Sequence, residues 1–189
     1  MSDPSSDIEQ HIIQGCKKKQ LRYQEMLYKE LYSYGMSISL RYTYSKEEAS
    51  EVLNDSFIKA FDKIKQYNAD QSFKGWFRRI LVNTAIDYYR KNKKYHNTLS
   101  IDRTEELEYD QQALQQLQVE DILKLLNGLP EIHRLTFNLY EIEGYRHDEI
   151  AAMLKISEST SRANLTRAKK RLRELFHQEF GKQHARGIR

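Results

Sequence analysis

Hydrophobic and polar positions alternate with helical periodicity along most of the chain, most clearly in residues 144–174. Three apolar residues share one face of a short first helix: Ile150, Ala151 and Leu154. Four more recur at three- and four-residue steps on a longer second helix: Leu165, Ala168, Leu172 and Leu175. Ser157 and Ser159 lie between the two stripes and are typical of a helix start. The pattern predicts a helix-turn-helix.

The opposite face of the second predicted helix is strongly basic. It contains six cationic residues: Arg162, Arg167, Lys169, Lys170, Arg171 and Arg173. A helix-turn-helix places its second helix in the major groove of DNA, with the N-terminal residues at the base edges. DNA is therefore the leading candidate partner.

The same periodicity predicts two or three helices in residues 8–66. The first has an apolar face made of Leu21, Met26, Leu27, Leu31 and Tyr34. Ser45 and Glu48 form a capping box at the start of another, which ends near Tyr67. Its apolar face contains Ala49, Val52, Leu53, Phe57, Ala60, Phe61 and Ile64.

Two further helices are predicted in the middle of the chain. Ser72 can cap a helix over residues 73–93, whose expected core residues are Trp76, Phe77, Ile80, Leu81 and Ala85. A helix over residues 111–127 has an apolar face made of Leu114, Leu117, Ile122 and Leu125. Pro130 is well placed as the first residue of the helix that follows.

The composition agrees with an all-α chain. Only 7 of the 189 residues are Gly and 2 are Pro, and long helical patterns need few of either. Cys16 is the lone cysteine, so an internal disulfide is impossible. No apolar run reaches the length of a membrane span and no signal peptide is recognised, so we expect a cytoplasmic protein.

Charge is segregated along the chain. Residues 72–97 hold seven bases and one acid, residues 100–121 hold seven acids and one base, and residues 155–173 hold seven bases and one acid. Two basic segments separated by an acidic one suggest two nucleic-acid contacts joined by a tether. We therefore predict two small helical domains joined by a linker, the C-terminal one a helix-turn-helix.

Three segments, taken in order, resemble a bacterial RNA polymerase sigma factor of the extracytoplasmic-function (ECF) group. Residues 51–61, EVLNDSFIKAF, resemble the family's region 2.2, and residues 73–85, FKGWFRRILVNTA, resemble its promoter-melting segment. Leu129 and Pro130, followed by residues 143–145 and the helix-turn-helix, resemble region 4. The resemblance covers nearly the whole chain.

The resemblance implies domain boundaries and partners. It implies a disordered start at 1–7, a region 2 domain at 8–97, an acidic linker at 98–112, a region 4 domain at 113–180 and a tail at 181–189. The implied partners are core RNA polymerase, through the clamp helices of its largest subunit and its flap region, promoter DNA, and an anti-sigma factor. It implies no cofactor, no metal, no small-molecule substrate and no catalysis by this chain.

Site residues follow from the resemblance in three sets. Polymerase docking falls on Glu51, Asn54, Asp55, Phe57 and Lys59. The resemblance assigns the opening and reading of the minus-ten element to eight residues: Asn68, Gln71, Arg78, Arg79, Asn83, Asp87, Arg90 and Lys91. Reading of the minus-thirty-five element falls on Ser159, Arg162, Ala163, Thr166, Arg167, Lys170 and Arg171.

Three positions depart from the family pattern. Arg146 replaces the usual Ser or Thr helix cap, Lys155 replaces a glycine in the turn, and Ser161 replaces a β-branched apolar residue. Lys155 therefore implies a less strained turn or a lysine in the left-handed conformation. These departures concern the geometry of the helix-turn-helix rather than its presence.

Alternatives to a sigma factor remain at this stage. A stand-alone helix-turn-helix regulator would share the basic segments but would not need the docking pattern of residues 51–61. An adaptor that mimics a sigma factor would lack base-reading residues such as Arg162 and Arg167. An enzyme is the weakest alternative, because the six histidines show no metal-ligand spacing and no phosphate-binding loop or nucleophile motif is present.

Overall fold

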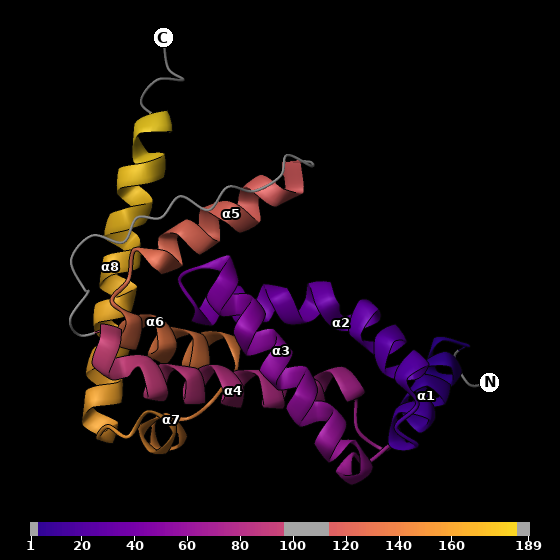
Figure 1. Ribbon diagram of the computed structural model, residues 1–189. Helices are drawn as coiled ribbons and strands as arrows, with labels where there is room; N and C mark the ends of the chain where they lie inside the picture. Colours follow the sequence, from indigo (N-terminus) through magenta and orange to yellow (C-terminus); the bar gives the residue numbers. More distant parts are fainter. Residues whose placement is uncertain (1–3, 97–113, 185–189) are drawn as a thin grey trace. The chain divides into compact units, whose positions relative to one another are not determined.

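The computed structural model describes residues 4–96 and 114–184, and within them every regular element is helical (Figure 1). The predicted all-α fold is confirmed. The chain divides into two compact units, residues 1–105 and 106–189. The predicted acidic linker at 98–112 lies entirely outside the described residues, so its boundaries stay a prediction.

Unit 1 is a bundle of four helices and a short 3-10 turn. Its elements are α1 (Pro4–Lys17), α2 (Leu21–Tyr42), α3 (Lys46–Lys63), η1 (Ile64–Gln66) and α4 (Phe73–His96). Helix α2 packs against α1, α3 and α4, so it lies at the centre of the bundle. Helix α1 begins at Pro4, inside the segment 1–7 that was expected to be disordered, because Ser5, Ser6 and Asp7 suit the polar first turn of a helix.

An aromatic cluster fills the interior of unit 1. The ring centroids of Phe57 and Phe77 lie 4.7 Å apart, and those of Tyr28 and Phe57 lie 4.6 Å apart. Helices α2 and α3 approach closely at Gly35, where a Cβ atom would lie only 2.4 Å from the Leu53 side chain. Helices α2, α3 and α4 therefore share one core.

Local signals set the start of α3. The Ser45 hydroxyl accepts a hydrogen bond from the Glu48 backbone N–H at 3.2 Å. The Glu48 carboxylate reaches back and accepts from the Tyr44 N–H at 2.9 Å, one residue before the position that the capping box predicts. The helix therefore begins where the sequence indicated.

The predicted apolar face of α2 is wrong at two positions. Leu21 is 79% exposed and Met26 is 40% exposed. The buried stripe of α2 passes through Leu27, Leu31 and Ile38. Met26 is one residue from Leu27 and so points about 100° away from that stripe.

Unit 2 contains five helical elements. They are α5 (Leu114–Asn127), α6 (Glu131–Phe137), the π-helical turn η2 (Asn138–Ile142), α7 (His147–Leu154) and α8 (Glu158–His184). The long helix α8 packs against α5, α6 and α7. Helix α8 extends past residue 180, so part of the predicted tail at 181–189 is helical.

The core of unit 2 also differs from the sequence prediction in detail. Leu123 and Leu126 of α5 are buried, whereas the predicted core residue Ile122 is 55% exposed. Several consecutive positions of α5 are apolar, so spacing alone did not define its buried face. Pro130 precedes α6 as its N-cap, and Glu131 is the first helical residue.

One charged side chain belongs to the core of unit 2. Arg134 is 0% exposed, and its Nη1 atom donates a hydrogen bond to Asn127 Oδ1 at 2.8 Å. A buried cation needs such polar partners because its transfer out of water is costly. This bond connects α6 to the end of α5.

Candidate nucleic-acid interface

The N-terminal half of α8 presents one continuous polar face. Its start is capped by Ser157, whose hydroxyl accepts from the Thr160 N–H at 3.0 Å. The predicted minus-thirty-five residues follow at three- and four-residue intervals, which places them on one side of the helix. All are exposed except the half-buried Ala163: Ser159, Arg162, Thr166, Arg167, Lys170 and Arg171.

Two arginines on this face are paired with carboxylates of their own helix. Arg162 pairs with Glu158, one turn earlier, and Arg171 Nη1 lies 3.4 Å from Glu174 Oε2. Both pairs are exposed, so they are weak and can be exchanged for a phosphate or a base. The pairs therefore position the two guanidinium groups and leave them available to other acceptors.

The turn between α7 and α8 takes the left-handed form. Lys155 has φ 53° and ψ 50°, so the lysine adopts the conformation that glycine usually supplies. This is one of the two geometries that the sequence left open.

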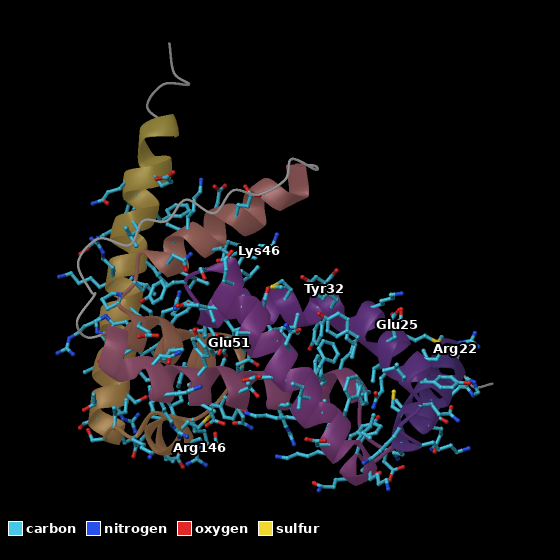
Figure 2. The ribbon with its side chains drawn as sticks, viewed as in Figure 1. Arg22, Glu25, Tyr32, Lys46, Glu51 and Arg146 are labelled. Atoms are coloured by element: carbon cyan, nitrogen blue, oxygen red, sulfur yellow. The ribbon has the colours of Figure 1, made fainter. Side chains whose placement is uncertain are left out.

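The start of α7 is stabilised from inside the helix. Arg146 gives no side-chain cap, as predicted, and instead its backbone N–H donates to Glu149 Oε2 at 2.8 Å. Figure 2 labels Arg146 at this end of the unit, and its Nε atom lies 3.3 Å from Asp148 Oδ1. The glutamate thus performs half of a capping box.

Ser161 has a partner that the sequence did not predict. Its side chain is 0% exposed, and its Oγ lies 2.9 Å from Nδ1 of His147. The imidazole of His147 also stacks on the Tyr140 ring, with centroids 4.5 Å apart. His147 therefore joins η2, α7 and α8, and among the described residues no group of three metal ligands occurs.

The second candidate surface lies on α4. Five of the predicted minus-ten residues are exposed at spacings that share one side of the helix: Arg79, Asn83, Asp87, Arg90 and Lys91. Arg78 is half-buried. Asn68 and Gln71 are exposed in the loop before the helix, where Asn68 Oδ1 accepts from the Asp70 N–H at 3.0 Å.

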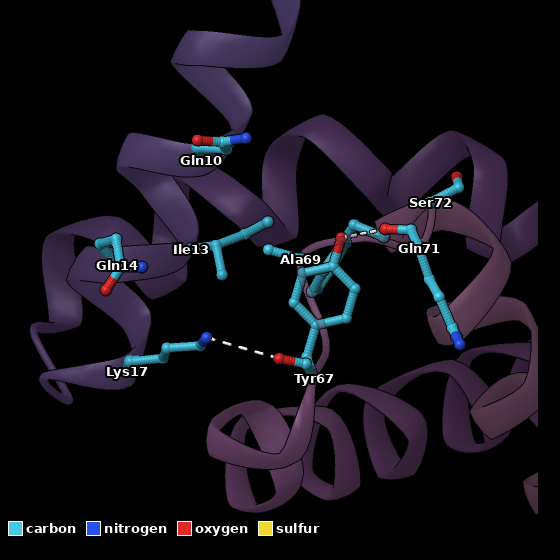
Figure 3. Close-up of a pocket in the computed structure, with 9 residues that line it drawn as sticks. Gln10, Ile13, Gln14, Lys17, Tyr67, Ala69, Gln71 and Ser72 are labelled. Carbon is cyan, nitrogen blue, oxygen red and sulfur yellow. Dashed lines mark hydrogen bonds between the residues drawn. The ribbon is translucent and has the colours of Figure 1, made fainter.

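A pocket opens beside this loop (Figure 3). It has a volume of about 270 Å³ and is lined by residues of the loop and the start of α4, and by residues of α1. Lys17 Nζ donates to the Tyr67 carbonyl oxygen at 3.5 Å, and the Tyr67 hydroxyl donates to the Gln71 carbonyl oxygen. The predicted core residue Trp76 is half-buried, 5.4 Å from the Tyr67 ring between centroids.

The third surface is a stripe on α3. Glu51, Asn54, Asp55 and Ile58 are all exposed at the spacing of a single helix face, and we call them the α3 stripe; Figure 2 labels Glu51 on α3. Ile58 is 61% exposed; it was not among the predicted docking residues, although its spacing from Asn54 and Asp55 places it on the stripe. Single exposed apolar residues are common on protein surfaces, and one surrounded by polar residues also fits the apolar centre and polar rim of an interface.

Phe57 does not belong to the α3 stripe. It is 3% exposed and packs against Tyr28 and Phe77, so direct contact with a partner does not fit its position. We correct that assignment, because Phe57 supports α3 from inside the bundle. Lys59 is half-buried at the edge of the stripe.

Unit 2 also has an apolar groove of about 300 Å³ between α5 and α8. Its exposed apolar walls are Ile122 of α5 and Phe176 of α8, which is 52% exposed. Arg173 and His177 lie at its edge. An exposed apolar groove with a basic edge suits an amphipathic partner segment.

Comparison with known proteins matches two segments of the chain to family models. The sequence model described as Sigma-70 region 2 matches residues 22–95, and the one described as Sigma-70, region 4 matches residues 119–172. The first match includes the α3 stripe and the exposed face of α4. The second includes the whole polar face of α8.

Curated relatives belong to the same family. The RNA polymerase sigma factor YlaC of Bacillus subtilis is 30% identical over 156 residues, which cover 79% of this chain and 90% of YlaC. The ECF RNA polymerase sigma factor SigM of Bacillus subtilis is 28% identical over 156 residues, covering 81% of this chain and 92% of SigM. The chain spans only 38% of a further sigma factor, from Xanthomonas campestris.

Solved structures of sigma factors are among those to which the chain is similar. The sigma factor RpoE, in complex with the anti-sigma factor NepR from Bartonella quintana, is 20% identical, with a TM-score of 0.49 over 80% of this chain and 95% of that one.

Two helical units, one of them a helix-turn-helix whose second helix has an exposed basic face, are typical of a DNA-binding transcription factor. With both sigma-70 regions matched in order, the chain belongs to the RNA polymerase sigma factors of the ECF group, and it is an alternative sigma factor acting with RNA polymerase. Sigma factors are initiation factors rather than catalysts. Among the residues that the structure describes, no helix has the length and apolar character to span a bilayer.

Proposed function

We propose that this sigma factor docks on the clamp helices of core RNA polymerase through the α3 stripe. The supporting observation is the exposure of Glu51, Asn54, Asp55 and Ile58 on one face of a helix whose opposite face is buried in the bundle. A central apolar residue with polar neighbours is the composition of a docking surface. Lys59 lies at the margin of this contact.

Opening of the minus-ten element is assigned to α4 and the loop that precedes it. Arg78, Arg79, Arg90 and Lys91 meet phosphates, which sets affinity and its salt dependence. Asn68, Gln71 and Asn83 lie where they can meet bases of the opened strand. An extruded base loses a few kcal/mol of stacking, roughly, so a pocket must offset that loss, and the pocket beside the loop is placed to do so.

Reading of the minus-thirty-five element is assigned to α8. Arg162 and Arg167 each reach a guanine in the major groove, and a bidentate contact discriminates by about 1–3 kcal/mol. Ala163 and Thr166 are small enough for close approach to the base edges. Ser159, Lys170 and Arg171 contact the backbone. The polar face of α8, on which six of the seven predicted residues are exposed, is the single observation that best supports this function.

Further contacts with proteins complete the proposal. The groove between α5 and α8 receives the flap region of the polymerase, because its apolar walls suit an amphipathic helix. An anti-sigma factor occupies these surfaces when the protein is held inactive; the relative RpoE was solved with one. The chain itself catalyses no reaction and works in the cytoplasm.

Reconstitution tests the proposal. Purified core polymerase, this protein and fragmented genomic DNA are combined, and the run-off transcripts are sequenced. Transcripts that share upstream motifs and appear only with the protein support a sigma factor and reveal its promoter. DNA binding without polymerase binding or transcripts would contradict the proposal and favour a stand-alone regulator.

A further inference from the structure

The π-helical turn η2 makes two separate contacts that lead to α8. Its defining hydrogen bond runs from the Glu143 backbone N–H to the Asn138 carbonyl oxygen, five residues earlier, at 3.0 Å. Such turns are rare and often occur at functional sites. The turn directly follows α6, which packs against α8. Two consecutive residues of η2, Tyr140 and Glu141, provide the two contacts.

The first contact reaches the start of α8 through His147. The Tyr140 ring stacks on the His147 imidazole, with centroids 4.5 Å apart and 23° between the ring planes. On its other side His147 Nδ1 lies 2.9 Å from Oγ of the buried Ser161. A buried hydroxyl needs such a partner, and a hydrogen bond is directional. The bond therefore fixes the position of the first turns of α8 relative to α7.

The second contact joins η2 to α8 directly. Glu141 Oε1 lies 2.6 Å from Lys169 Nζ, and the two side chains are partly buried, with exposed fractions of 33% and 41%. Lys169 belongs to the basic face of α8 in the sequence, yet its ammonium is engaged within unit 2. Lys169 follows Ser161 by eight residues, which is about 12 Å along the helix axis. Two attachment points at this separation restrain both the rotation and the tilt of α8.

The residues proposed to approach the base edges all lie between these two attachment points: Arg162, Ala163, Thr166 and Arg167. A bidentate contact with guanine needs both donors of the arginine aligned with O6 and N7. Recognition of this kind requires groups held to within about 0.5 Å by supporting contacts behind them. A small rotation of α8 would displace all four side chains together. The contacts from η2 therefore bear on the choice of base.

We propose that Glu141 and His147 are positioning residues for the minus-thirty-five element. Glu141 holds α8 through Lys169, and His147 holds it through Ser161, so that Arg162 meets its guanine in register. The inference rests on the proposed assignment of this element to α8. It also gives Lys169 a role different from that of the other cations on the basic face, because Lys169 orients the helix instead of binding a phosphate.

The test uses holoenzyme assembled from core polymerase and the full chain, on a promoter found by run-off sequencing. Dissociation constants are measured on this promoter and on derivatives in which each minus-thirty-five base pair is substituted in turn, at several salt concentrations. The ratio between substituted and cognate promoters reports base choice. The slope of log affinity against log salt concentration reports phosphate contacts, because each lost contact reduces it by about 0.9.

Glu141→Gln should lower the ratio at the guanine read by Arg162 by at least about 3-fold, out of the roughly 5- to 150-fold that a bidentate contact supplies. The salt slope should not fall. Glu141 is an exposed residue, so the variant should keep the fold. His147→Phe retains a ring beside Tyr140 but has no hydrogen bond for Ser161, and it should lower the ratio as well. Lys169→Arg keeps the ion pair and should keep the wild-type ratio.

Lys169→Met and Lys170→Met form a matched pair, because the two lysines are neighbours on α8 and only Lys169 is paired with Glu141. Lys170 is proposed to contact the DNA backbone. Lys170→Met should therefore reduce the salt slope by about 0.9 and keep the ratio. Lys169→Met should lower the ratio and keep the slope.

Three outcomes would overturn the inference while leaving the sigma-factor function intact. The first is a wild-type ratio in both Glu141→Gln and His147→Phe. The second is an equal loss of affinity on cognate and substituted promoters, which would show a general structural role. The third is a fall in slope in Lys169→Met equal to that in Lys170→Met, which would make Lys169 a phosphate contact. Absence of any transcript with the wild-type protein would instead contradict the proposed function itself.

Discussion

The Nζ atom of Lys59 on α3 lies 3.5 Å from Oδ2 of Asp87 on α4. The other carboxylate oxygen, Oδ1, lies 3.3 Å from Nη1 of Arg90. Lys59 borders the proposed polymerase contact, and Arg90 belongs to the proposed minus-ten surface. One carboxylate therefore lies between the two surfaces and neutralises part of the charge of each.

Asp87→Asn separates two possible roles of this residue. Because Asp87 is paired with two cations, we expect its neutralisation to raise the affinity for non-specific single-stranded DNA a few-fold. The pairs are exposed, so the free energy of unfolding should fall by less than about 1 kcal/mol. Fluorescence anisotropy with labelled oligonucleotides measures the affinity. A loss of affinity that depends on sequence would show that Asp87 reads a base instead.

Ser161→Ala should destabilise unit 2. The substitution removes the hydroxyl that lies 2.9 Å from His147 Nδ1 at a buried position, so we expect a loss of about 1 kcal/mol in the free energy of unfolding. Urea denaturation measures it. A double-mutant cycle with His147→Leu gives the coupling energy of the pair, and additive losses would show that the two side chains do not interact in solution.

Arg162→Ala should abolish the preference for guanine at one position of the minus-thirty-five element while polymerase binding persists. Loss of a bidentate guanine contact lowers the yield from the cognate promoter by about 5- to 150-fold, which corresponds to roughly 1–3 kcal/mol. Run-off transcription on cognate and substituted promoters measures this. Arg173→Ala, on the same helix but at the groove, should retain the base preference. An equal fall in polymerase binding by Arg162→Ala would argue against the assignment.

Removal of the α3 stripe should weaken polymerase binding. In the combined variant Asp55→Ala and Ile58→Ala, both changes lie at exposed positions, so the helix content should stay unchanged. We expect the dissociation constant for core polymerase to rise by at least about 10-fold, as for central interface residues. Glu30→Ala, an exposed acid on α2, is the control. Wild-type affinity in the double variant, measured by biolayer interferometry, would refute the docking assignment.

The stability of unit 2 should depend on pH through His133. Burial, and secondarily the nearby charge of Arg167, lower the pKa of His133 below its usual 6.5. Between that pKa and 6.5 the unfolded chain binds more protons than the folded one, so stability is complete above pH 6.5 and declines as the pH falls through the lowered pKa. His133→Gln should flatten this part of the curve in urea titrations. An unchanged slope would mean that other groups cause it.

Much of this architecture follows from local sequence signals. The caps at Ser45 and Ser157 were predicted correctly because a cap needs only residues that lie within a few positions of one another. The polar face of α8 was predicted for a similar reason, since helical spacing alone places its residues together. The family resemblance then assigned a function to the residues on those faces.

Contacts between distant segments were not predictable in the same way. The helical pattern placed Phe57 on an apolar face, but its partners Tyr28 and Phe77 belong to other helices and were not predicted. The apolar face of α5 was misjudged at Ile122 because adjacent positions are equally apolar. The α1 side of the pocket exists because Lys17 lies close to Tyr67, which is 50 residues later in the chain. Helical periodicity does not predict such a contact.

The pairing of Arg162 with Glu158 has a consequence for how the protein scans DNA. A guanidinium that is already engaged must exchange its carboxylate for another acceptor, and among the base edges of the major groove guanine offers two acceptors, O6 and N7, at once. On DNA of random sequence this exchange gains little free energy. The Arg162 side chain then keeps its pair with Glu158, and the protein leaves the site. In the proposed complex Glu158 would compete with every base that Arg162 meets, and this competition would set a threshold of affinity below which a site is not retained.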